Sequence, residues 1–169
     1  MPRFIPFPEQ CIALASFDDR SSATSFNAAF GVLYGTGMLL GELLGLRRID
    51  VTILERMRLE VSGFRARTLP VPKGAADRLL LLLNDDRAYL EDEPIFRTNG
   101  KSMLDMSVVW ELKRRSRLLG FPRPLVTTDL RMAFATHMAD RQTPFEIIAQ
   151  MMGYKNVNQL HAFITRAAS

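Results

Sequence analysis

Residues 36–46 decide the fold, and they read TGMLLGELLGL. The helical spacing of apolar residues that leads into this stretch stops at Gly37 and resumes in a run of leucines. A glycine placed where a helical pattern stops is typical of a helix end. The sequence therefore predicts one helix over about 25–37 and a second over about 39–46.

A different pattern follows these two predicted helices. Polar and apolar residues alternate over 51–54 and 56–61, which is the spacing of a half-buried strand. Ser62 and Gly63 form a turn signal, and residues 65–71 have the composition of a returning strand. The sequence thus predicts a small antiparallel sheet inserted among helices.

Helical spacing dominates the rest of the chain, interrupted by a turn signal at Asn99-Gly100. We therefore expect a single domain over residues 1–169 that is mainly α with a small antiparallel β-sheet, an α+β fold. The other predicted helices cover about 9–19, 74–90, 102–119, 129–141, 144–152 and 156–166.

The composition is that of an ordinary globular domain, with 47% apolar and 24% charged residues among 169. The formal net charge of +4 permits an anionic partner without requiring one. Cys11 is the only cysteine, so an internal disulfide is excluded and a cysteine-based metal site has no support. We expect no cofactor, no metal and no small-molecule substrate. A reducing cytoplasm fits, and no apolar run reaches the roughly 18 residues that cross a bilayer.

Three other stretches of the sequence belong with residues 36–46. Residues 128–137 read TDLRMAFATH, residues 151–154 read MMGY, and the predicted strand at 67–72 reads RTLPVP. Together with residues 36–46, they resemble the two conserved boxes and the intervening hairpin of the tyrosine recombinases, the phage-integrase family. The resemblance covers about residues 20–166 and implies an integrase catalytic-domain-like fold. Family members usually add an N-terminal helical domain that completes a clamp around DNA, for which we expect no room in 169 residues.

The resemblance also implies where the chemistry would lie. In the family a tyrosine hydroxyl attacks a DNA phosphate, arginines and histidines hold the phosphate oxygens, and a hairpin lysine protonates the leaving oxygen. Phe163 stands at the nucleophile position without a hydroxyl, and Leu39 stands at the first arginine position without a charge. In the order arginine, lysine, histidine, arginine, histidine and tyrosine, the family positions fall on Leu39, Ser62, Thr128, Arg131, Tyr154 and Phe163. The lysine position falls near Ser62, and Arg65 or Arg67 close by is the alternative for it.

Arg131 is the one position that keeps the family's residue, and it allows two interpretations. It is either a remnant phosphate ligand or a structural group that pairs with Glu42 or Asp129. The structural interpretation is favoured because an arginine among apolar side chains needs a counter-charge.

Basic side chains are the candidates for contacts with the DNA backbone, since a guanidinium or ammonium group neutralises a phosphate. On the predicted helix over 102–119, helical spacing places several of them on one face, with Arg115 beside them. The alternative for that helix is a solvated face opposite Val108, Val109, Leu112, Leu118 and Leu119. The DNA-binding candidates are Arg47, Arg48, Arg65, Arg67, Lys113, Arg114, Arg117 and Arg131.

Three functional hypotheses follow. The leading one is a catalytically inactive integrase-like protein of a bacterial mobile element that binds DNA as a regulator or accessory factor. The second is a protein-interaction module that docks on an active recombinase or another element-encoded protein, or forms a homo-oligomer, without binding DNA. The third is an active recombinase in which Tyr154 has taken over the role of the nucleophile.

Overall fold

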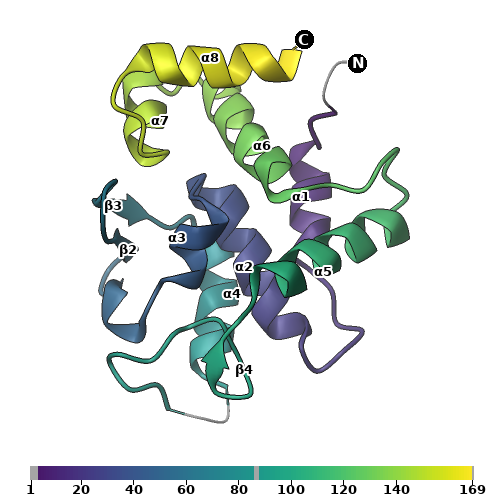
Figure 1. Ribbon diagram of the computed structural model, residues 1–169, viewed down its shortest axis with the longest axis vertical. Coiled ribbons are helices and arrows are strands. Elements are labelled where there is room, and N and C mark those ends of the chain that lie inside the picture. The colour runs from purple at the N-terminus through teal and green to yellow at the C-terminus, as the bar shows by residue number, and fades with distance from the viewer. Residues whose placement is uncertain (1–3, 86–87, 169) are drawn as a thin grey trace.

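The computed structural model describes residues 4–85 and 88–168 of the chain. Its helices are α1 (Pro8–Leu14), α2 (Ala23–Thr36), α3 (Leu40–Leu44), α4 (Lys73–Leu83), α5 (Asp105–Leu118), α6 (Thr127–Asp140), α7 (Phe145–Met151) and α8 (Val157–Ala168), with a 3-10 turn at Arg48–Asp50. Helix α2 runs through the middle of the molecule, and α8 lies across one end, beside α6 and α7 (Figure 1). The prediction of a mainly helical domain with a small sheet is confirmed.

The sheet lies between α3 and α4 in the chain and contains β1 (Val51–Ile53), β2 (Met57–Val61) and β3 (Arg67–Pro70). All neighbours are antiparallel, in the order β1-β2-β3, and Leu59 is the register partner of both Val51 and Leu69. Every second residue of β2 is buried and those between are exposed, as the alternating sequence predicted. The sheet therefore covers the helical core with one face and leaves the β2–β3 hairpin projecting.

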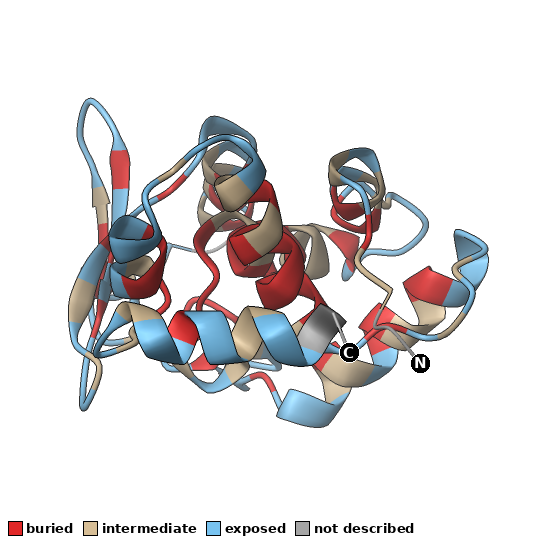
Figure 2. Ribbon diagram, turned by 90° about the horizontal axis from the view of Figure 1, so that it is seen from above, coloured by how far each residue is buried: buried red, intermediate tan, exposed pale blue. Residues whose placement is uncertain are grey.

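The buried apolar side chains form two clusters. The larger one joins α1, α2, α4, α5 and the inner face of the sheet around residues such as Phe30 and Leu59. The smaller one joins α6, α7 and α8, with Leu160 as the fully buried anchor of α8. Figure 2 shows α8 exposed along most of its length with a single buried band. The C-terminal helices thus pack through their own small core against the end of α6.

The structure corrects one local prediction. The helix predicted over 74–90 ends at Leu83, and Leu90 at the far end of the predicted range is exposed; residues 86–87 of that range lie outside the described residues. The turn predicted at Asn99-Gly100 is confirmed, and it joins two short strands that the sequence pattern did not predict, β4 (Arg97–Thr98) and β5 (Lys101–Ser102). In residues 4–85 and 88–168, no helix is long and apolar enough to cross a bilayer.

The buried face of α5 also differs from the prediction. Leu118 and Leu119 are exposed, whereas Arg115 is 0% exposed. The Arg115 guanidinium donates to the Glu111 carboxylate at 2.8 Å and to the Leu14 carbonyl at 2.7 Å, and it lies 4.6 Å from the centre of the Phe17 ring. Because these partners replace water around the cation, the Arg115 side chain can be buried. The pattern had predicted that Leu118 and Leu119 would lie on the buried face instead.

Candidate functional site

A close contact between Gly37 and Phe134 joins residues 36–46 to residues 128–137. Gly37 ends α2 in the left-handed conformation, with φ of 70°, and its amide donates to the Leu33 carbonyl at 3.0 Å. The ring of Phe134 on α6 occupies the space where a side chain at position 37 would stand. This contact fixes the start of α3, and with it Leu39, relative to α6.

An ion pair between Glu42 and Arg67 joins α3 to the β2–β3 hairpin. The Arg67 guanidinium donates to both carboxylate oxygens, at 2.6 and 2.9 Å, and also to the Met151 carbonyl at 2.7 Å. Burial would raise the pKa of Glu42, but hydrogen bonds from Arg67 and from the Leu39 amide hold it below its ordinary value. The pair therefore locks the hairpin, α3 and the end of α7 together.

The expected pairing of Arg131 with Glu42 or Asp129 is wrong. Glu42 is bound by Arg67, and Asp129 accepts two hydrogen bonds from Arg123, both at 2.8 Å. Each carboxylate is thus satisfied by a nearer guanidinium. The structural interpretation named the wrong partners for Arg131, although it correctly expected the side chain to be buried.

Arg131 instead faces aromatic rings. Its guanidinium carbon lies 5.7 Å from the ring centre of Tyr154 and 5.6 Å from that of Phe163. Nη2 is 3.4 Å from the Tyr154 hydroxyl and 3.5 Å from the Met152 carbonyl, while the buried Nη1 has no hydrogen-bond partner among the described residues. Burial lowers the pKa of Arg131, and the neighbouring Tyr154 and Glu42 partly offset the shift. The arginine keeps its charge, because guanidinium pKa values lie far above neutrality.

Of the other five positions at which the resemblance places family residues, two contact the Arg131 guanidinium. Tyr154 and Phe163 contact Arg131 directly, and their own ring centres are 6.0 Å apart. Leu39 precedes α3 with 39% of its surface exposed, Ser62 is exposed at the end of β2, and Thr128 is half-buried in the first turn of α6. The fold therefore brings together one charge, one hydroxyl and a phenyl ring.

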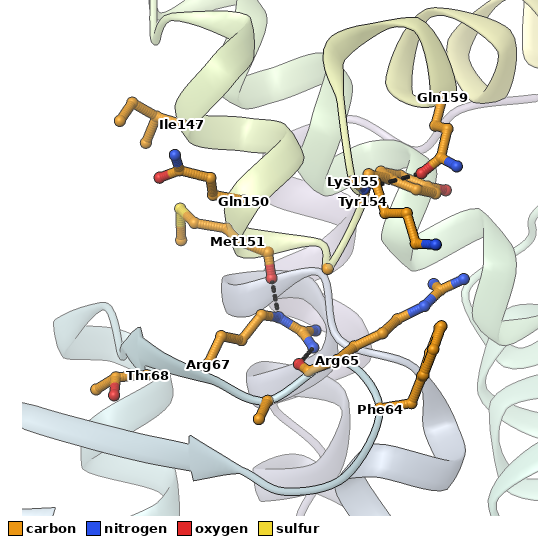
Figure 3. Close-up of a pocket in the computed structure, with 12 residues that line it drawn as sticks. Phe64, Arg65, Arg67, Thr68, Ile147, Gln150, Met151, Tyr154, Lys155 and Gln159 are labelled. Atoms are coloured by element: carbon orange, nitrogen blue, oxygen red, sulfur yellow. Dashed lines mark hydrogen bonds between the residues drawn. The ribbon is translucent and has the colours of Figure 1, made fainter.

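A hollow lies between the β2–β3 hairpin and the turn that joins α7 to α8. Its volume is about 460 Å³, and side chains from both segments point into it (Figure 3). The Arg65 and Lys155 side chains approach each other across it, and the Phe64 ring stands beside Arg65. Sequence reasoning missed Phe64 and Lys155, although Lys155 directly follows the MMGY stretch and Phe64 follows the turn signal at Gly63.

The candidate DNA-binding side chains differ in their burial and in the partners that they already have within the protein. Arg67 is engaged by Glu42, Arg114 pairs with Glu111 and Asp19 at 2.6 and 2.8 Å, and Arg131 is buried. The side chains of the other five are at least partly exposed, although Arg47 pairs with Asp50 at 3.7 Å and Arg48 donates to the Val51 carbonyl at 3.0 Å. The five are Arg47, Arg48, Arg65, Lys113 and Arg117.

Comparison with known proteins assigns the family. A model of the phage integrase family matches residues 8–168. The tyrosine recombinase XerA of Pyrococcus furiosus is 32% identical over 143 residues, which is 79% of this chain and 48% of that protein. The tyrosine recombinase XerC of a Methylobacterium strain is 30% identical over 168 residues, or 93% of this chain and 52% of that protein. The chain thus spans about half the length of these curated relatives.

Solved structures agree on the fold. A crystal structure of XerA recombinase superposes with a TM-score of 0.82 at 20% identity, covering 96% of this chain and 58% of that chain. The Tn1549 transposon integrase, in complex with circular intermediate DNA, gives a TM-score of 0.79 at 18% identity, covering 99% and 64%. The chain therefore belongs to the phage integrase family, the tyrosine recombinases, and has the fold of their catalytic domain.

Proposed function

We propose that this protein is a catalytically inactive integrase-like domain of a bacterial mobile element, which acts by binding DNA as a regulator or accessory factor. The observation that carries the proposal is the contact of the Phe163 ring with Arg131, because the resemblance places the family's nucleophile at residue 163. The family reaction needs an oxygen that attacks phosphorus, and a phenyl ring has none.

The loss of positive charge at the site supports the same conclusion. Leu39 replaces an arginine that would stabilise the charge developing on the phosphate, and removing one such donor costs about 10²–10³ in rate. Ser62 and Thr128 replace the lysine and the first histidine. Losing several donors together with the nucleophile leaves no route for strand cleavage by the family mechanism.

The retained fold and the exposed cations support the binding half of the proposal. The net charge is +4, and Arg65 and Lys155 share one hollow on the hairpin side of the molecule. Lys113 and Arg117 line a second hollow on α5, of about 580 Å³. The Tn1549 integrase structure is a complex with DNA, which supports DNA as the ligand of the same fold here.

Fluorescence anisotropy with a labelled duplex, repeated across a range of salt concentrations, tests DNA binding. The logarithm of the association constant should fall with the logarithm of salt concentration, by about 0.9 for each phosphate neutralised. The double change Arg65→Ala/Lys155→Ala should weaken binding and reduce that slope by about 2. Lys73→Ala is the matched control, because Lys73 already pairs with Asp77 at 2.9 Å. Binding that is absent, or indifferent to salt, would refute this half of the proposal.

The protein-interaction module remains the second candidate, and the surface of α5 favours it. Leu104, Met106, Trp110 and Leu118 are large apolar side chains on or beside this helix that are more than half exposed. Met106 and Trp110 are four residues apart, which places them on one face of α5, and exposed apolar groups that lie together mark many protein-binding surfaces. A pull-down that depends on Trp110, combined with failure to bind DNA at low salt, would favour this candidate.

The relocated nucleophile is the third candidate. Its support is the Tyr154 hydroxyl, which lies 3.4 Å from Nη2 of Arg131. Against it, Arg131 is the one cation that the family positions supply, so a phosphate at Tyr154 would lack the other donors of the family mechanism and would depend on cations at other positions, such as Arg65, whose guanidinium carbon lies 5.9 Å from the Tyr154 ring centre. A covalent adduct between Tyr154 and DNA would establish this candidate over the first.

A further inference from the structure

The phenyl ring of Phe64 is the most exposed of the large apolar side chains in residues 4–85 and 88–168. Phe64 lies in the turn between β2 and β3 and is 86% exposed, which leaves almost its whole apolar area in water. Exposed aromatic side chains are enriched where they meet a ligand, because their burial on binding is favourable. Phe64 also borders the hollow of about 460 Å³ between the hairpin and the α7–α8 turn (Figure 3).

The charges around Phe64 define what the hollow can accept. The Lys155 ammonium lies 5.6 Å from the centre of the Phe64 ring, and the Arg65 guanidinium carbon lies 5.9 Å from that of Tyr154. Within residues 4–85 and 88–168, neither cation has a carboxylate partner. The neighbouring Arg67 is engaged by Glu42 and the Met151 carbonyl. A ligand would therefore meet a flat apolar face flanked by two available positive charges.

The remaining lining adds groups that recognise polar edges. Gln150 is exposed on α7, and Gln159 on α8 also lines the hollow, although its Oε1 already accepts a hydrogen bond from the Lys155 amide at 2.9 Å. An amide side chain can donate and accept hydrogen bonds at once, which suits the edge of a nucleobase. The volume falls within the range of about 300–1,000 Å³ that is usual for small-ligand sites.

We propose that this hollow binds an unpaired nucleotide, with its base stacked on Phe64 and its phosphate held by Arg65 and Lys155. Bases within an intact duplex are stacked on one another, so a protein ring gains a full base face only when a nucleotide leaves the stack. The inference rests on the proposed DNA binding and makes it more specific: the preferred ligand is DNA with an extrahelical or single-stranded nucleotide. An unpaired nucleotide within a strand and a free nucleotide share this chemistry.

Anisotropy titrations with two labelled duplexes test the inference. One duplex is fully paired, and the other is identical except for one additional unpaired nucleotide at its centre. The protein should bind the second more tightly by about 5- to 150-fold, the range expected from stacking one base on an aromatic side chain. Phe64→Ala should remove most of this preference while leaving affinity for the paired duplex nearly unchanged, and Phe64→Tyr should keep the preference.

Leu54→Ala is the matched control, because Leu54 is an apolar residue between β1 and β2 that is 81% exposed. It should leave the preference intact. Both substituted side chains are largely in solvent, so circular dichroism should show both variants folded. Adding a deoxynucleoside monophosphate as competitor distinguishes the two sources: competition below millimolar concentration assigns the hollow to free nucleotides, and its absence, with the preference retained, assigns it to a DNA strand.

Equal affinity of the wild-type chain for the two duplexes would overturn the inference and leave DNA binding standing. A preference that survives Phe64→Ala would overturn it as well. Failure to bind either duplex at low salt would instead refute the proposed function on which it rests.

Discussion

Gly37→Ala tests the contact that holds the two conserved stretches together. At φ of 70°, an alanine would pay about 1–2 kcal/mol for the left-handed conformation. Its β-carbon would also overlap the Phe134 ring, lying 2.7 Å from Cε1, and overpacking of this kind costs about 1–3 kcal/mol more. We therefore expect the free energy of unfolding to fall by about 2–5 kcal/mol.

Gly120→Ala is the control for the backbone contribution. Gly120 has nearly the same φ, 73°, but a β-carbon there would meet no atom within 4 Å among the described residues. It should cost only about 1–2 kcal/mol. Urea denaturation followed by circular dichroism measures both values, and for a chain of this size each kcal/mol lowers the melting temperature by about 2–4 °C. If both variants lost equal stability, the Phe134 ring would not be seated against Gly37 and the proposed joint would be wrong.

Other internal contacts of the molecule can be tested by substitution, by pH and by chemical labelling. Arg67→Ala should lower the free energy of unfolding by about 3–5 kcal/mol, because it leaves the largely buried Glu42 carboxylate unpaired. Lys73→Ala, at a pair where the Lys73 side chain is 90% exposed, should cost at most about 1 kcal/mol, and equal losses would contradict the ranking. Folding lowers the pKa of Glu42, so the ionised carboxylate stabilises the fold fully at pH values above its ordinary pKa of 4.5, and this stabilisation is lost as the pH falls through the lowered pKa. Glu42→Gln should therefore make the free energy of unfolding depend less on pH across that acid range. Urea titrations at several pH values measure this dependence. Burial and nearby Glu9 raise the pKa of Cys11 to about 12, so a thiol reagent should label it only after unfolding, and immediate labelling of the native protein would count against its burial.

Much of this fold follows from local pattern in the sequence. Gly37 ends α2 where the helical spacing stops, and β2 alternates in and out as its residue types require. These elements were predictable because each depends on neighbours close in the chain. The β4–β5 hairpin was not, because two-residue strands are too short to show a period.

The site was harder to predict for a different reason. Arg131 was expected beside Glu42 or Asp129, but Arg67 and Arg123 reach those carboxylates in space. Choosing among several arginines for one carboxylate needs three-dimensional distances that spacing along the chain does not give. The burial of Arg115 was missed for the same reason, since its aromatic surroundings come from α2 and from the segment between α1 and α2.

Covalent trapping tests most directly the claim that this chain binds without cutting. The purified protein is incubated with a pool of nicked suicide duplexes of randomised central sequence, and denaturing gels with mass spectrometry then seek protein joined to DNA. No adduct should form, because Phe163 offers no attacking oxygen. An adduct mapped to Tyr154, and abolished by Tyr154→Phe, would contradict it.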